Sequence, residues 1–128
     1  MALGPLGQIH VSVTDLDRSV AFYRDVLGIE LLFRVPGQPM AFFASGDVRL
    51  YLGVPESSEF GTRCLLYFRV PDIETERDRL VDAGLTVGAP HVVHRDGVTD
   101  LWMAALTDPD GHHLVLMEER PGGRPDKT

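Results

Sequence analysis

An internal repeat is the feature that most constrains how this chain can fold. Each half contains an alternating β-branched stretch, an aspartate that can cap a helix, a helix that ends at a glycine, and three further stretches typical of strands. Superposing the halves aligns Val13 with Val70 and Asp15 with Asp72, a constant shift of 57 residues (70 − 13 = 72 − 15). Two copies of one supersecondary unit predict a duplicated βαβββ architecture.

The pattern of each copy predicts its elements. In the first copy we expect a strand at 9–13, a helix from near Leu16 to Leu27, and strands at 31–35, 40–44 and 48–54. In the second copy we expect a strand at 64–70, a helix from Ile73 to the glycine at 84, and strands at 86–95, 99–106 and 112–117. The second helix is the weaker match, because Arg77 stands where the first has Val20.

The boundaries follow from these elements. We predict one α+β domain over residues 1–118, with unit one at about 7–55 and unit two at about 62–118. Residues 119–128 are polar and rich in glycine and proline, which predicts a flexible tail.

The charge and amino-acid composition of the chain exclude some classes of binding partner. The net charge of −7 and the pI near 5.0 argue against a nucleic-acid partner or an anionic membrane surface. No apolar run approaches the ~20 residues of a membrane span. Cys64 is the one cysteine, so no intramolecular disulfide can form. A single cysteine and the lack of a signal peptide favour a cytoplasmic protein.

Two stretches carry a family resemblance. VTDLDRSVAFYRDVLGIEL and LTDPDGHHLVLME, together with the repeat, resemble the vicinal oxygen chelate superfamily over about residues 7–118. That superfamily contains glyoxalase I, the extradiol dioxygenases, the fosfomycin-modifying enzymes and the bleomycin-binding resistance proteins. The resemblance implies two curled mixed sheets with a cleft, a divalent metal in the cleft of the enzymes, and pairing of two chains as a homodimer. Because the fold hosts both enzymes and binders, it does not choose between them.

The resemblance also implies where metal ligands would lie. Counting from the helix caps and the turn glycines, the four positions hold Gln8, Leu50, Leu65 and Val115. Glutamine is acceptable at the first position, since some glyoxalases use it, but the other three side chains offer no lone pair. An offset of one residue at Leu50 would bring in Arg49 or Tyr51. Because one amide oxygen cannot hold a divalent ion, we expect no metal cofactor, with an altered Zn, Ni, Mn or Fe site as the alternative.

Strand alternation predicts the lining of the cleft. If Gln8 faces it, His10 and Ser12 do too, whereas Ile9 and Val11 face the helix. Apolar walls with a few polar groups are typical of a small-molecule pocket. Trp102 is either an aromatic wall of this pocket or plain core, and Arg69 could pair with an anionic group. The full predicted ligand-binding set is Gln8, His10, Ser12, Leu50, Leu52, Leu65, Tyr67, Arg69, Trp102, Val115 and Met117.

Other groups that resemble metal ligands have simpler explanations. His112 and His113 point to opposite faces of a strand, so they cannot chelate one ion together. A strand also separates His91 from His94. Glu118 and Glu119 lie past the position that the family uses, which favours a solvated strand end.

Two functions from different classes follow. The first is a metal-free protein that binds or sequesters a small, largely apolar or aromatic organic molecule. The second is a glyoxalase- or dioxygenase-like enzyme, a lyase or oxygenase, with an altered metal site or with His10 as catalytic general base. Whether the chain is an enzyme stays open at this point.

Overall fold

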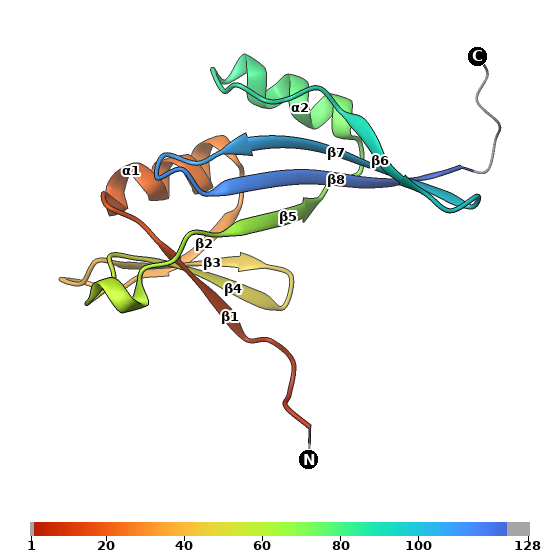
Figure 1. The fold of residues 1–128 in the computed structure, drawn as a ribbon. Helices are drawn as coiled ribbons and strands as arrows, with labels where there is room; N and C mark the ends of the chain where they lie inside the picture. The colour runs from red at the N-terminus through yellow and green to blue at the C-terminus, as the bar shows by residue number, and fades with distance from the viewer. Residues whose placement is uncertain (1, 123–128) are drawn as a thin grey trace. The chain divides into compact units, whose positions relative to one another are not determined.

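The computed structural model describes residues 2–122 and forms two compact units. The first unit contains the residues up to Cys64 together with Asp108–His112, and the second contains Leu65–Thr107 and the chain from His113 onward. Each unit has one four-stranded mixed sheet and one main helix (Figure 1), which confirms the predicted α+β fold of two βαβββ units.

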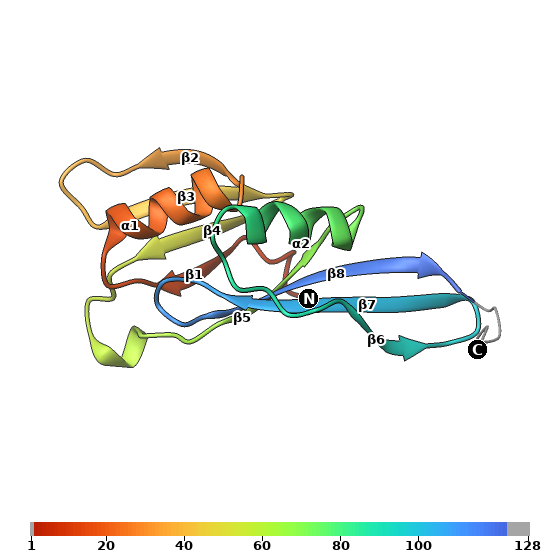
Figure 2. The same ribbon diagram turned by 90° about the horizontal axis from the view of Figure 1, so that it is seen from above.

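The first unit follows the predicted order of elements. Its sheet has the strand order β1-β4-β3-β2, with β1 parallel to β4 and the other pairs antiparallel (Figure 2). The elements are β1 (Gln8–Ser12), α1 (Leu16–Ala21), the π-helical turn η1 (Phe22–Val26), β2 (Glu30–Arg34), β3 (Met40–Ser45), β4 (Val48–Gly53) and the 3₁₀ turn η2 (Ser58–Phe60).

Helix α1 begins where the sequence predicts and packs on one face of its sheet. Asp15 caps it by accepting a hydrogen bond from the Arg18 backbone N–H at 3.1 Å. The helix contacts β3 and β4. The side chains at this contact form the core of the unit, where Val11, Tyr23, Phe43 and Leu52 are fully buried.

The second unit repeats the topology with the strand order β5-β8-β7-β6. Its elements are β5 (Leu65–Arg69), α2 (Ile73–Asp82), β6 (His91–Arg95), β7 (Thr99–Thr107) and β8 (His113–Pro121). Arg77, which replaces the apolar residue of the first helix, donates from Nε to the carbonyl oxygens of Val87 and Gly88 at 3.1 and 2.9 Å. This explains the weaker apolar pattern of α2, because one of its positions anchors the following loop instead of filling the core.

Two predicted boundaries need correction. Strand β6 begins at His91 and not at residue 86, because Pro90 has no N–H to donate to a ladder. Strand β8 continues to Pro121, paired with β7, so residues 119–121 do not belong to a flexible tail. The remainder of the predicted tail from residue 123 lies outside the described residues. Among residues 2–122, no helix is long and apolar enough to cross a membrane.

Candidate functional site

The register between β1 and β4 decides which side chains share the open face of the first sheet. Paired residues of parallel neighbours lie on the same face, and Gln8, His10 and Ser12 pair with Arg49, Tyr51 and Gly53. Leu50 and Leu52 pair with Ile9 and Val11, and they are buried on the face that carries α1.

The prediction that Leu50 and Leu52 line the same surface as Gln8 is therefore wrong. The residue that pairs with Gln8 lies three positions after its turn glycine, whereas the residue that pairs with Leu65 lies two positions after Gly111. Transferring the count from one unit to the other misses this difference, and a shift of one residue moves every side chain to the opposite face.

Four rings form a continuous row across the open face of the first sheet. His10 meets Tyr51 edge to face with ring centroids 4.6 Å apart, and Tyr51 stacks on Phe42 at 4.8 Å. Phe42 stacks in turn on Phe33 at 4.8 Å. We call this set, which takes one ring from each of β1, β4, β3 and β2, the aromatic row. Because neighbouring rings already pack against one another, the row is a preorganised aromatic surface that offers apolar contact area to a small ligand.

A pocket of about 380 Å³ opens beside the row. Its lining consists of His10, Tyr51, Val54, Pro55, Glu56 and Phe60. Gly53 shapes this region, because a Cβ at that position would lie 2.7 Å from Cε1 of Tyr51. The absence of a side chain thus lets the phenol ring fold over the backbone of its own strand.

Most residues of this site were not predicted from the sequence. Of the pocket lining, only His10 was predicted as a site residue, and Tyr51 was named only as an offset alternative to Leu50. Phe42 and Phe33 were not predicted in the site. The alternation of side chains in 40–44 and 48–54 was the available signal. It assigns the rings to a face of the sheet only once the register of these strands against β1 is known.

The imidazole of His10 is half-buried and available to a ligand. Burial, with a smaller contribution from nearby His112, lowers the pKa of His10 below its ordinary value. Within residues 2–122 its ring nitrogens make no hydrogen bond. A neutral ring with one donor and one acceptor nitrogen can therefore bind a polar group in the pocket.

The residue set does not fit the divalent metal of the family's enzymes. The amide oxygen of Gln8 accepts a hydrogen bond from Nη2 of Arg49 at 2.9 Å. A guanidinium cation at the one predicted ligand oxygen repels a metal ion, and the side chains of Leu65 and Val115 carry no ligand atom.

Ser12, the third polar residue of β1 predicted on this face, is hydrogen-bonded to a backbone N–H group. The hydroxyl of Ser12 accepts a hydrogen bond from the Thr62 backbone N–H at 2.7 Å, and the two hydroxyls are 3.1 Å apart. Ser12 thus joins β1 to the segment after η2. Its predicted role in ligand binding stays a prediction.

The histidine pair after the turn has a structural explanation. His112 is 3% exposed, and its Nδ1 accepts from the Cys64 backbone N–H at 2.8 Å. The ring proton therefore lies on Nε2, which donates to the Ser12 carbonyl at 2.6 Å. With both nitrogens occupied, His112 joins the turn Asp108–His112 to the first unit and has no lone pair left for a metal.

On the second sheet, five predicted lining residues share one face, as the alternation predicts. Leu65, Tyr67 and Arg69 pair with His113, Val115 and Met117. Leu65 is 55% exposed and Tyr67 is 49% exposed, whereas Val115 is buried. That these residues bind a ligand stays a prediction.

Trp102 lies on the opposite face, so of its two predicted roles the one as an aromatic wall of the pocket is wrong. It pairs with Glu118 across β7 and β8, and that face carries α2. The guanidinium of Arg120 lies over the indole ring, 4.8 Å from its centroid.

The prediction that a strand separates His91 from His94 is also wrong. A register shift in β6 pairs His91 with Met103 and His94 with Leu101. These two partners are alternate residues of β7, so both histidines lie on one face.

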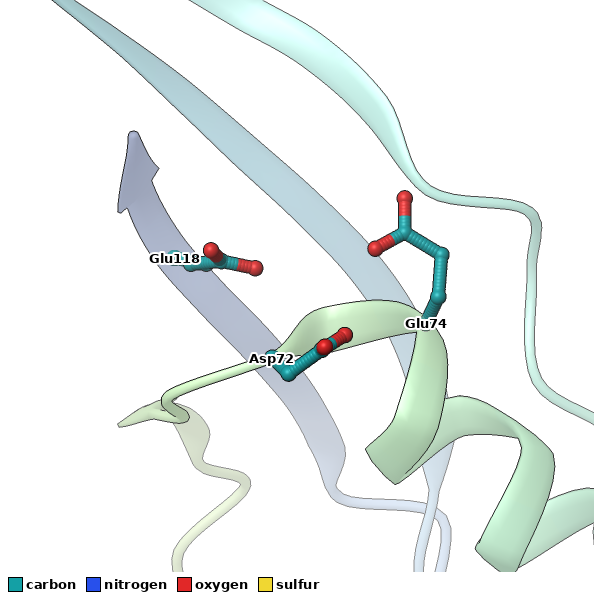
Figure 3. Close-up of side chains that lie close together, drawn as sticks. All are labelled: Asp72, Glu74 and Glu118. Carbon is teal, nitrogen blue, oxygen red and sulfur yellow. The ribbon is translucent and has the colours of Figure 1, made fainter. Parts of the chain in front are cut away.

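A cluster of three carboxylates gathers where α2 begins (Figure 3), and each one already has a structural partner. Asp72 caps the helix through the Thr75 N–H at 3.1 Å, and Glu118 accepts from the Ile73 N–H at 2.8 Å. Arg120 donates to both Glu118 and Glu74, and its hydrogen bond lowers the pKa of Glu118. The cluster therefore anchors the helix, and Glu118 is no simple solvated strand end.

Comparison with known proteins adds a family and several similar structures. The model of the Glyoxalase/Bleomycin resistance protein/Dioxygenase superfamily matches residues 6–116. TnmS3, an antibiotic binding protein from Streptomyces sp. CB03234, is 25% identical with a TM-score of 0.76, over 94% of this chain and 99% of that chain. Lactoylglutathione lyase from Agrobacterium tumefaciens is 24% identical with a TM-score of 0.76, over 91% of this chain and 95% of that chain. The similarity to the lactoylglutathione lyase shows only that the two proteins share a fold.

Proposed function

Because this chain belongs to the Glyoxalase/Bleomycin resistance protein/Dioxygenase superfamily, we propose that it binds a small planar aromatic molecule without a divalent metal. The observation that carries this proposal is the aromatic row with the pocket of about 380 Å³ beside it. Protein pockets for small ligands are mostly apolar, with a few polar groups that fix the orientation. Here the apolar part comes from the rings and Val54, and the polar groups are His10 and Glu56.

The arrangement of the rings favours a flat ligand. Tyr51 and Phe42 are nearly parallel, with an interplanar angle of 22°, and Phe33 continues the row at 27° to Phe42. An additional ring placed against the exposed part of Tyr51 would gain stacking energy of about 0.5–1.5 kcal/mol beyond the burial of its area. The phenylalanine of η2, which is 60% exposed, offers a second apolar surface at the pocket.

Two further observations support binding over metal catalysis. The Gln8 amide is held by Arg49 and does not face an ion. In addition, the structural neighbour TnmS3 is described as an antibiotic binding protein. We therefore propose that this chain holds or sequesters its ligand.

A thermal-shift screen of planar aromatic compounds, followed by calorimetric titration, tests this proposal. We expect Tyr51→Ala to weaken binding of a hit by tenfold or more, because it removes the ring shared by the row and the pocket. Tyr67→Ala is the matched tyrosine change on the second sheet. Loss of affinity in the first variant alone places the ligand on the aromatic row, whereas loss in both supports the wider surface predicted from the sequence.

A metal-content measurement tests the other half of the proposal. The protein is exposed to Ni²⁺, Zn²⁺, Mn²⁺ and Fe²⁺ and then desalted. We expect no stoichiometric retention. Near-stoichiometric metal that is lost in Gln8→Ala would contradict the proposal and favour the enzyme hypothesis.

Catalysis by His10 is the second candidate function. It is favoured by the neutral, half-buried imidazole with two unoccupied ring nitrogens at the pocket. A general base needs such a group within reach of the substrate. Unchanged turnover of an identified substrate by His10→Ala would rule out this role.

From the resemblance we also propose that two chains pair as a homodimer, which equilibrium sedimentation measures directly. A cytoplasmic location is proposed from the single cysteine alone, and fractionation of cells that express the protein tests it.

A further inference from the structure

We propose that the pocket beside the aromatic row selects a ligand that carries a positive charge on its aromatic or apolar body, with Glu56 as the counter-ion. This inference rests on the proposed function, since it specifies the chemistry of the molecule that binds there. It follows from the distribution of charge and rings around the pocket.

The lining of the pocket carries a negative charge. Of the six residues that line the pocket, one is a carboxylate and none is lysine or arginine. Glu56 is exposed in the segment after β4, and no ion pair involves it among residues 2–122. A carboxylate that no cation of residues 2–122 neutralises gives the pocket a negative potential.

The other lining groups also suit a cation. The rings of Tyr51 and Phe60 border the same pocket, and the face of an aromatic ring attracts a cation through its quadrupole. His10, the remaining titratable ring besides the phenol, is neutral near pH 7 and adds no opposing charge. Rings together with one carboxylate form the usual environment for an organic ammonium or a charged heteroaromatic ring.

Arg49 is a cation on the same face of the first sheet, and its position decides whether it opposes such a ligand. Arg49 precedes Tyr51 by two residues on β4, whereas the pocket is built from residues at the other end of that strand and beyond it. Its guanidinium lies 5.0 Å from the centroid of Phe42, and it also donates to Gln8. Arg49 is thus occupied on the opposite side of the row from Val54 and Glu56.

The net charge of the whole chain also favours a positively charged ligand. The net charge of −7 attracts cations and repels anions over a Debye length of roughly 8 Å at physiological salt. This long-range contribution acts on the rate of association, whereas Glu56 acts on the bound state.

A matched set of probes tests the proposal. N-methylquinolinium, quinoline and quinoline-6-carboxylate have similar size and shape and carry a positive, zero and negative charge at pH 7.5. Calorimetric titration at low salt measures their affinities for the wild type and three variants. Glu56→Gln removes the pocket charge, Glu59→Gln removes a nearby charge that does not line the pocket, and Tyr51→Ala locates the site.

We expect N-methylquinolinium to bind roughly tenfold more tightly than quinoline, and the carboxylate to bind most weakly. Glu56→Gln reduces the preference for the cation to about twofold, while Glu59→Gln leaves it unchanged within that factor. Equal affinities of the three probes, a preference for the anion, or an equal loss in both glutamate variants would overturn the charge selectivity and leave the proposed binding function standing. Failure of every probe to bind, or binding that Tyr51→Ala does not weaken, would overturn both the inference and the proposed site.

Discussion

The two βαβββ units have the same strand order, yet the corresponding rows on their open faces differ in aromatic content. In the first unit the row consists of four rings, His10, Tyr51, Phe42 and Phe33. The row at the equivalent register of the second unit consists of Tyr67, Val115 and Ala105, and next to it Gly88, which precedes β6, donates its N–H to the Ala105 carbonyl at 2.9 Å. The shared frame therefore fixes where a surface lies, and the residues on it decide whether that surface can stack a flat ligand.

The turns that precede the last strand of each unit differ in the same way. Between β3 and β4, Gly46 and Asp47 are exposed. Between β7 and β8, Asp108 is 5% exposed and accepts a hydrogen bond from the buried Tyr23 hydroxyl at 2.7 Å. Burial of the ring, followed by the charge and the hydrogen bond of Asp108, raises the pKa of Tyr23. One turn is thus a simple connection, and the other is part of the core of the first unit.

Removing the buried carboxylate gives the largest expected effect. We expect Asp108→Ala to lower the free energy of unfolding by about 3–4 kcal/mol, because the Tyr23 hydroxyl and the N–H groups of Asp110 and His112 lose their acceptor. Asp47→Ala in the exposed turn is the control, with an expected change within about 0.5 kcal/mol. Urea denaturation measures both, and equal effects would contradict the contrast between the turns.

Substitution of His112 gives the next largest expected loss in the free energy of unfolding. We expect His112→Ala to cost about 2–3 kcal/mol, because the Cys64 N–H and the Ser12 carbonyl lose their partner and a small cavity forms. His113→Ala changes the exposed neighbour and is expected to stay within about 0.5 kcal/mol. Comparable destabilisation by both variants would show that the ring of His112 does not hold the turn.

The sequence predicted the frame well because repeats, helix caps and turn glycines are local signals. Asp15 and Asp72 cap the two helices as expected, and the face shared by Leu65, Tyr67 and Arg69 follows from simple alternation. The errors arise where two distant strands must be aligned. The face on which Leu50 lies depends on the register of β4 against β1, and the face on which His94 lies depends on a bulge in β6. Neither the register nor the bulge can be predicted from the local sequence pattern.

The aromatic row was missed for the same reason. Its four rings come from four strands, and only the pairings among β1, β4, β3 and β2 bring them into line. The role of Glu118 was likewise out of reach, because it accepts a hydrogen bond from Ile73, 45 residues away in the chain.

Alanine in place of one glycine in each unit tests how the two open faces differ in ligand binding, with little expected loss of stability. An added Cβ at position 53 would lie 2.7 Å from the Tyr51 ring, whereas at position 88 it would meet its nearest atom at 3.7 Å. We expect Gly53→Ala to push the ring out of place, to weaken aromatic probes about three- to tenfold, and to destabilise by about 1 kcal/mol or less. Gly88→Ala should leave binding unchanged. Calorimetric titration and thermal melts measure the two effects, and undiminished binding by Gly53→Ala would separate the ring position from ligand affinity.

The smallest expected effect is a dependence of stability on pH through His10. Its pKa is lowered in the folded protein, first by burial and then by His112, so the unfolded chain takes up the proton at a higher pH than the folded chain does. The contribution of His10 to stability is therefore fully present above the unfolded value of about 6.5 and declines as the pH falls below it. Tyr51, His112, Glu56 and Cys64 lie near His10 among the described residues, and all four remain in the variant His10→Asn. Between pH 7.5 and 5.5 the wild type should lose more stability than this variant, as measured by thermal melts at both pH values. An equal loss would mean that the ring is protonated as easily in the folded chain as in the unfolded one, and that the pocket does not keep His10 neutral for its ligand.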